Sequence, residues 1–154
     1  MEHQAGTLVL GENKRWKQDC DMGSQNNQNF GSMPTGLLKQ MIIYKASDAG
    51  IKTIMQEESY TSQADITAMD YIPVYGVDAE NAVFSGRRIS RSLYRCFNGM
   101  IINADCNGAA NIMRKAITDA WNSITDFSFL ASPEVSGFHE LNPLSISVKG
   151  IAAA

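Results

Sequence analysis

The stretch SLYRCFNGMIINAD, residues 92–105, contains the clearest turn signal in the chain. An Asn-Gly pair at 98–99 separates two runs rich in apolar residues, which is typical of a two-residue type I′ hairpin turn. A turn of that length would place Tyr94 opposite Asn103, with Asp105 on the same face of the hairpin. The stretch therefore predicts a β-hairpin whose second strand ends close to an aspartate.

Helical spacing begins directly after this hairpin. Apolar residues recur at intervals of three and four from Ala109 to Trp121, which is the period of one helix face. Asp105 thus lies where a strand passes into a helix, a place where aspartate is often an N-cap. Asp105 or Asn107 could fill that capping role.

Upstream of the hairpin, the pattern is strand, long loop, helix, strand. The strands are expected at 7–11 and 51–56, and the polar residues 12–33 form the loop. The helix should begin at Pro34, with Ser32 as a candidate cap, and stop at Gly50. Its expected apolar face contains Leu37, Leu38, Met41, Ile42 and Lys45. This order of elements is typical of an α/β layer.

Two segments lack a clear period. Residues 64–84 carry acids, Pro73, Gly76 and scattered aromatics, and we interpret them as a surface insertion. Residues 122–154 contain two prolines and end in small side chains. We expect this end of the chain to form a loosely attached tail.

Composition limits the class of protein. A chain of 154 residues with 44% hydrophobic residues is long enough for one domain with a core. No apolar run approaches the roughly 18 residues of a bilayer span, and the first residues lack a targeting pattern. We therefore expect a cytoplasmic protein without a membrane partner. The net charge of −3 argues against nucleic-acid binding by the whole surface, but it leaves local basic patches open.

Acidic residues stand at the ends of two predicted strands. Glu57 and Glu58 follow the strand at 51–56, and Asp105 follows the hairpin. Mg²⁺ and Mn²⁺ prefer carboxylate oxygens, and nucleases gather such acids at a sheet edge. Solvated turn residues and a helix cap are the alternatives, and spacing alone favours them.

Two basic clusters are candidates for phosphate contacts. The first contains Arg87, Arg88, Arg91 and Arg95, and the second contains Lys14, Arg15, Trp16 and Lys17. Positive grooves with an aromatic platform hold single strands without sequence preference. The alternative for the first cluster is a solvated hairpin face.

Five collinear segments between about residues 7 and 117 resemble a known family. They are LVLGENKRWKQ, NNQNF, QEESYTS, VFSGRRISRSLYR and GMIINADCNGAANIMRKA. Together they are similar to the C-terminal part of the OrfB/TnpB family of transposon-encoded, RNA-guided DNA endonucleases, relatives of the type V CRISPR effectors. The resemblance implies a RuvC-like, RNase H-like α/β fold, with a mixed sheet, flanking helices and its first strands absent from this chain. Residues 1–121 would form this part of the nuclease domain, with a target-nucleic-acid-binding insertion at about 61–98.

The resemblance also implies a metal site. The segment ADCNGAANI matches the family's last catalytic motif, which makes Asp105 the counterpart of a metal-binding aspartate. Many members carry a catalytic glutamate where this chain has Gly11. In another branch the acid stands in the motif seen here as EESYTS, which makes Glu58 the expected ligand and Glu57 the second choice. The implied cofactor is Mg²⁺ or Mn²⁺.

Two departures from the family pattern shape the expected function. Many members have a zinc ribbon, but Ala64 stands where one of its cysteines could be. Cys20, Cys96 and Cys106 form no C-x-x-C pair, so we expect no zinc. The family's first catalytic aspartate and its guide-RNA region lie upstream of everything in this chain. We therefore expect weak metal binding at most, and no DNA cleavage by the chain alone.

The expected partners are DNA near the nucleoid, guide RNA in the full-length family, and a separately encoded N-terminal half. A non-catalytic nucleic-acid-binding module is the main alternative. A small α/β protein whose acids and arginines pair with one another is the third.

Overall fold

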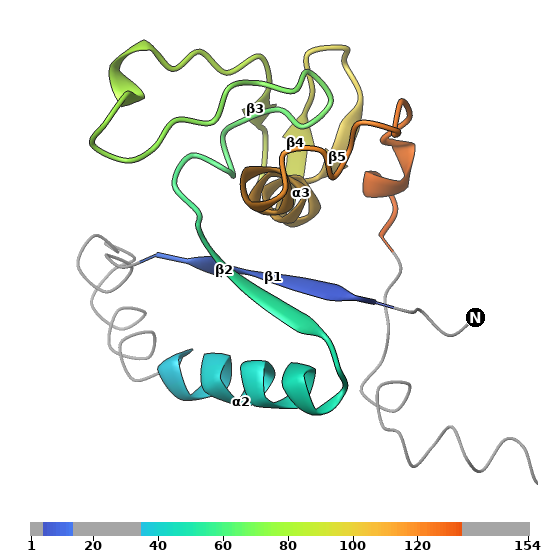
Figure 1. The fold of residues 1–154 in the computed structure, drawn as a ribbon. Helices are drawn as coiled ribbons and strands as arrows, with labels where there is room; N and C mark the ends of the chain where they lie inside the picture. Colours follow the sequence, from blue (N-terminus) through green and yellow to red (C-terminus); the bar gives the residue numbers. More distant parts are fainter. Residues whose placement is uncertain (1–4, 14–34, 134–154) are drawn as a thin grey trace, which may run out of the picture.

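Two parallel strands and a helix that packs on them form one part of the molecule. The computed structural model describes residues 5–13 and 35–133. Strands β1 (Thr7–Glu12) and β2 (Lys52–Glu57) pair in parallel, and α2 (Thr35–Asp48) precedes β2. Figure 1 shows α2 on one side of this sheet. The predicted strand, helix, strand order is thus confirmed, while Ser32 and Pro34 lie outside the described residues.

The end of α2 follows from a glycine. Gly50 adopts a φ of 72°, a left-handed conformation that glycine reaches without a steric penalty. The backbone N–H of Ile51 donates to the carbonyl of Ala46 at 2.8 Å, and that of Gly50 donates to Ser47 at 3.0 Å. These bonds close the last turn, so the predicted stop at Gly50 is confirmed.

The predicted apolar face of α2 is wrong in part. Leu37, Leu38 and Met41 are 58%, 54% and 56% exposed. The side that packs consists of Ala46, which is buried, and of the half-buried Lys39 and Ile42. Because the sheet beneath the helix has two strands, it can cover only a narrow stripe of the helix surface.

A separate antiparallel sheet holds the second half of the described chain. It contains β3 (Arg87–Arg88), β4 (Leu93–Arg95) and β5 (Ile101–Asn103), in that order. Among the described residues, the parallel and antiparallel strands belong to different sheets rather than to one mixed sheet. The α/β class is confirmed, and the expected single mixed sheet is not what residues 5–13 and 35–133 form.

The register of the hairpin differs by one residue from the prediction. Tyr94 lies opposite Ile102, not opposite Asn103. The loop is longer than expected because Cys96 pairs with Met100, and Gly99 between them has a φ of 84°. Hairpin loops of three residues typically end in such a glycine. The shift places Tyr94 and Ile102 together in the core, where both are fully buried.

Helix α3 (Ala104–Ala116) lies between the two sheets (Figure 1). The buried core around it contains Ile66, Tyr94, Cys96, Ile102, Ala104, Ala110, Phe127 and Leu130. The helix ends earlier than its apolar pattern predicted, because Ile117 has an extended conformation with a φ of −134°. Within the described ranges, no helix has both the length and the apolar character that a membrane span requires.

The segment after α3 packs against the core. Phe127 and Leu130 are buried, and the ring of Trp121 lies 6.1 Å from that of Phe127. The indole N–H of Trp121 donates to the carbonyl of Ala110 at 3.0 Å. The loose tail expected at 122–154 is therefore wrong for 122–133, and the remainder lies outside the described residues.

Candidate functional site

Glu57 ends β2 with a lysine as its partner. Its carboxylate accepts hydrogen bonds from Nζ of Lys115 at 2.5 Å and from the backbone N–H of Ser59 at 2.6 Å. Lys115 also donates to the carbonyls of Ser59 and Pro73. Burial disfavours the charged form of Glu57, but the hydrogen bonds from Lys115 and Ser59 outweigh it and lower the pKa. This acid therefore joins β2 to the last turn of α3.

The substitution Lys115→Met should make the protein less sensitive to acid. The pKa of Glu57 is lower in the folded state than its ordinary value of 4.5, so its contribution to stability is present above about pH 4.5 and is lost as the pH falls through the folded pKa. Without Lys115 only the hydrogen bond from Ser59 still favours the charged form, and because the Glu57 carboxylate is partly exposed and screened by water, we expect a loss of about 0.5–1 kcal/mol at pH 7. Urea unfolding at pH 7 and at pH 3.5 measures the loss of stability and the smaller dependence of stability on pH.

The exposed Lys52 provides the control for this measurement. The substitution Lys52→Met removes the same charge from β2 without removing a partner of Glu57. It should leave the pH dependence of unfolding as it is in the native chain. An equal acid dependence in the native chain and in Lys115→Met would contradict the role assigned to the Glu57–Lys115 pair.

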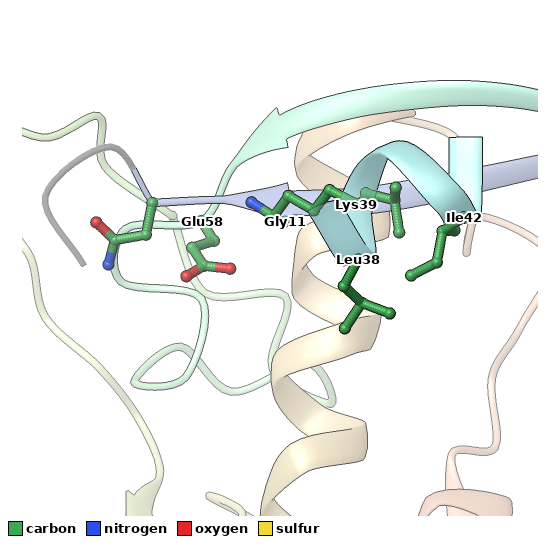
Figure 2. A pocket seen from close by; sticks show the side chains of 7 residues that line it. Gly11, Leu38, Lys39, Ile42 and Glu58 are labelled. Carbon is green, nitrogen blue, oxygen red and sulfur yellow. The ribbon is translucent and has the colours of Figure 1, made fainter. Parts of the chain in front are cut away.

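Glu58 lies in a different environment from Glu57. Its carboxylate has no hydrogen-bond or ion-pair partner among the described residues, and it borders a pocket of about 340 Å³. The pocket is lined by Leu10, Gly11, Asn13, Leu38, Lys39, Ile42 and Glu58. Figure 2 shows the Glu58 carboxylate beside Gly11, at the end of β1, with side chains of α2 on the other wall. Pockets outside the carboxyl ends of parallel strands are frequent ligand sites in α/β folds.

Asp105 is exposed at the start of α3. The N-cap of this helix is Asn103, whose side chain accepts from the backbone N–H of Asp105 at 2.9 Å and of Cys106 at 3.0 Å. The predicted alternatives, Asp105 and Asn107 as caps, are therefore wrong. The Asp105 side chain is 84% exposed and accepts from Nη2 of Arg88 at 3.2 Å.

The three predicted acids are not gathered in one place. Asp105 stands in the first turn of α3, while Lys115, the partner of Glu57, stands in the last turn. Ten residues of helix span about 15 Å, so Glu57 lies far from Asp105. Gly11, the neighbour of Glu58, packs against Ile112, which is about 10 Å along the helix from Asp105.

The candidate metal ligands do not form a complete metal site. Across residues 5–13 and 35–133, no three side chains of His, Cys, Asp or Glu lie close enough together to hold an ion. Asp105, at the start of α3, and Glu58, which lies beside Gly11 near Ile112, are too far apart to supply the compact carboxylate clamp that Mg²⁺ requires in a nuclease. The described residues alone therefore do not fit a resident divalent ion.

The first basic cluster divides into two parts. Arg87 lies directly opposite Arg95 in the ladder of β3 and β4, and both are exposed without an acidic partner among the described residues. They border a hollow of about 420 Å³ that Phe84 and Phe97 also line. Like charges placed directly opposite each other are unfavourable, and an anion between them would relieve the repulsion. This arrangement suits a phosphate beside an aromatic surface.

Arg88 and Arg91 are placed differently. The guanidinium of Arg88 donates to the carbonyls of Ser90 and Arg91 and to the carboxylate of Asp105. Arg91 is exposed. Arg88 is therefore a link between the hairpin and α3, rather than a free phosphate ligand. The second cluster, Lys14, Arg15, Trp16 and Lys17, lies outside the described residues.

Two buried aspartates, which the sequence pattern did not reveal, organise the insertion. Asp65 is fully buried and accepts from Phe97 N at 2.7 Å, Thr67 N at 2.8 Å and Thr67 Oγ1 at 2.7 Å. Asp70 accepts from the backbone N–H groups of Asp65 and Ser85. The segment 64–84 is therefore clamped to the hairpin by carboxylates. The Asp-x-Thr sequence at 65–67, typical of an Asx turn, was the available signal.

Cys96 lies close to this network. It is 3% exposed, and burial raises the pKa of its thiol to about 11. The thiol is consequently protonated at neutral pH.

The asparagines of the ADCNGAANI segment have structural roles. Asn107 donates to the carbonyl of Ala64 at 2.8 Å and accepts from Ile66 N at 3.2 Å. Asn111 donates to the carbonyls of Thr61 and Ala64 at 3.0 and 2.7 Å. Both side chains are fully buried. The segment therefore binds α3 to the chain at 61–66 as well as presenting Asp105.

Two comparisons relate this chain to known proteins. The family model described as "Cas12f1-like, TNB domain" matches residues 36–112, half of the chain. The CRISPR-associated endodeoxyribonuclease Cas12f1 of Sulfoacidibacillus thermotolerans is 37% identical over 93 residues, which is 60% of this chain and 18% of that protein. The chain thus spans less than a fifth of the length of this relative. The matched region contains the hairpin, the clamped insertion and α3 as far as Ile112, and this chain belongs to the Cas12f1-like TNB domain family.

Proposed function

We propose that this chain is a C-terminal part of a RuvC-like, RNA-guided, metal-dependent DNA endonuclease of transposon origin, and that its own contribution is to bind nucleic acid. Membership in the Cas12f1-like family supports the endonuclease connection. The opposed pair Arg87 and Arg95, exposed without an acidic partner beside Phe84 and Phe97, is the observation that carries the binding role. A backbone phosphate satisfies both guanidinium groups, and an adjacent base contacts an aromatic ring.

The acids of the chain are proposed as part of a larger site. Asp105 is exposed, and the Glu58 carboxylate is free of partners among the described residues. We propose that they contribute to binding Mg²⁺ or Mn²⁺ only when another protein segment supplies a further acid and brings the set together. A separately encoded N-terminal half with guide RNA is the proposed source. Loss of part of a catalytic unit lowers rates by orders of magnitude, so the chain alone should not cut DNA.

Binding to a fluorescently labelled single-stranded oligonucleotide tests the proposed function. Each phosphate contact to a single strand contributes about 0.7 to the slope of log K against log salt concentration. Replacing both Arg87 and Arg95 by glutamine should therefore lower the slope by about 1.4 and weaken binding about tenfold or more. Fluorescence anisotropy over a series of salt concentrations gives both quantities.

Lys52→Gln is the matched control, because Lys52 is exposed on β2, away from the hairpin. It should leave the salt slope close to that of the native chain. Binding that does not weaken with salt, or an Arg87→Gln/Arg95→Gln variant that binds like the control, would contradict the proposal. The same mixtures with Mg²⁺, run on a denaturing gel, should show an uncut strand.

A non-catalytic nucleic-acid-binding module is the second candidate, favoured by the lack of a three-acid group in the described parts of the chain. Addition of a separately made N-terminal half, guide RNA and Mg²⁺ distinguishes the two. Target cutting that Asp105→Ala abolishes supports the endonuclease role. No cutting in the complete mixture supports the binding module.

A further inference from the structure

At position 11 of β1, the space that a side chain would occupy is taken by another side chain. A β-carbon built on Gly11 would overlap Oε2 of Glu58 and would lie 3.1 Å from Cδ1 of Ile112. Gly6, which immediately precedes β1, has no atom within 4 Å of such a β-carbon. Gly11 is also absent from the residues with positive φ, so its backbone conformation does not require glycine. The feature particular to this glycine is therefore its close approach to the side chain of Glu58.

That neighbour is an acid from a different strand. In the ladder, Gly11 lies opposite Gln56, and Glu58 stands two residues further on, beyond the end of β2. Its side chain turns back over Gly11 and places the carboxylate at the edge of the pocket (Figure 2). This carboxylate is half-buried and has no partner among the described residues, so the space above Gly11 is what accommodates it there.

We propose that Gly11 is a positioning residue for Glu58. Its missing side chain lets a carboxylate that follows β2 occupy the space above the end of β1, where a side chain of residue 11 would otherwise stand. Positions 11 and 58 consequently exclude each other, and only one of them can present a group at this edge of the pocket. This proposal builds on the role of Glu58 as an acid of the proposed nuclease site.

Gly11→Ala should move the Glu58 carboxylate with little loss of stability. The atom that clashes is the end of a long side chain that can rotate away, so we expect the melting temperature to fall by only about 2 °C. Gly11→Glu should lower it by about 5 °C or more, because two carboxylates then compete for one space beside Ile112. In that background, Glu58→Ala should raise the melting temperature again.

The experiment uses the full chain labelled with ¹³C at glutamate carboxyl carbons, with the Glu58 signal assigned through Glu58→Gln. We expect this signal to shift in Gly11→Ala and to stay in place in Gly6→Ala. In the Gly11→Ala background, the shorter acid of Glu58→Asp should restore the melting temperature. A Glu58 signal that moves no more in Gly11→Ala than in Gly6→Ala would overturn the inference, as would a Gly11→Glu variant that Glu58→Ala fails to recover.

The carboxyl signal keeps the proposal testable even if Gly11→Glu does not fold. The same samples also separate this inference from the proposed function. Oligonucleotide binding depends on Arg87 and Arg95, which lie in the other sheet, and should be the same in Gly11→Ala and the native chain. Failure of the native chain to bind DNA therefore counts against the proposed function alone, and a missing signal shift counts against the role of Gly11 alone.

Discussion

Replacing Asp65 by alanine should lower the free energy of unfolding by about 3–5 kcal/mol, the range of large single-residue effects. Three donors lose their acceptor at once: the backbone N–H groups of Phe97 and Thr67 and the hydroxyl of Thr67. Asp65 is fully buried, so water cannot replace the carboxylate without disturbing the core around Tyr94 and Cys96. Urea unfolding followed by circular dichroism measures the loss.

A second aspartate in the chain provides a matched control. Asp126 accepts from the backbone N–H and the hydroxyl of Ser128, the same local pattern that Asp65 makes with Thr67, but it is exposed. Asp126→Ala should cost far less, because water reaches this exposed carboxylate and can take over its hydrogen bonds. The loss of stability in Asp65→Asn should lie between those of the two alanine variants. An amide keeps one acceptor oxygen, but its NH₂ group then faces a donor. Equal losses for Asp65→Ala and Asp126→Ala would contradict the clamp.

Gly86→Ala should destabilise the protein by about 2–4 kcal/mol through overpacking. A β-carbon at this position would lie 2.5 Å from Cε1 of Tyr94, 2.6 Å from its hydroxyl oxygen and 2.8 Å from the carbonyl oxygen of Arg95. Tyr94 has no space to retreat, since it is fully buried and donates to the carbonyl of Gln63 at 2.7 Å. The melting temperature of the variant measures the effect.

Gly6→Ala is the control for Gly86, because it adds the same methyl group where no atom lies within 4 Å. Its melting temperature should stay within about 2 °C of the native value. Tyr94→Phe should recover only part of the loss in the Gly86→Ala background, because it removes the hydroxyl contact and leaves the ring. A melting temperature for Gly86→Ala equal to that of the control would show that β3 can move away from β4 without cost.

Sequence patterns of a few residues predicted the elements that form through contacts between neighbours in the chain. The glycine at 50 stops α2, and β-branched runs form β1 and β2. The Asn-Gly pair at 98–99 does lie in a hairpin loop. However, the pair does not specify the loop length, and a one-residue difference changes every cross-strand partner. Burial of Tyr94 and Ile102 against α3 selects the observed register.

The sequence named the candidate acids but did not determine where they lie relative to one another. The resemblance pointed to Asp105 and Glu58, and both are accessible in the structure. Glu57 could not be told apart from Glu58 by sequence, because the residue that distinguishes them, Lys115, is 58 positions away. The capping role of Asn103 was also missed. It follows from the boundary between β5, which ends at Asn103, and α3, which begins at Ala104.

By itself, the sequence determined the class of fold, the strand, helix, strand order of the first layer, and which basic and acidic side chains the chain possesses. These properties follow from backbone preferences and hydrophobic periodicity, which act over a few residues. Only the tertiary structure decided that Glu57 pairs with Lys115, that Asp65 holds the hairpin, and that Gly11 leaves space for Glu58. Such partnerships depend on packing between segments tens of residues apart, because burial selects the donor, the acceptor or the empty space that each side chain meets.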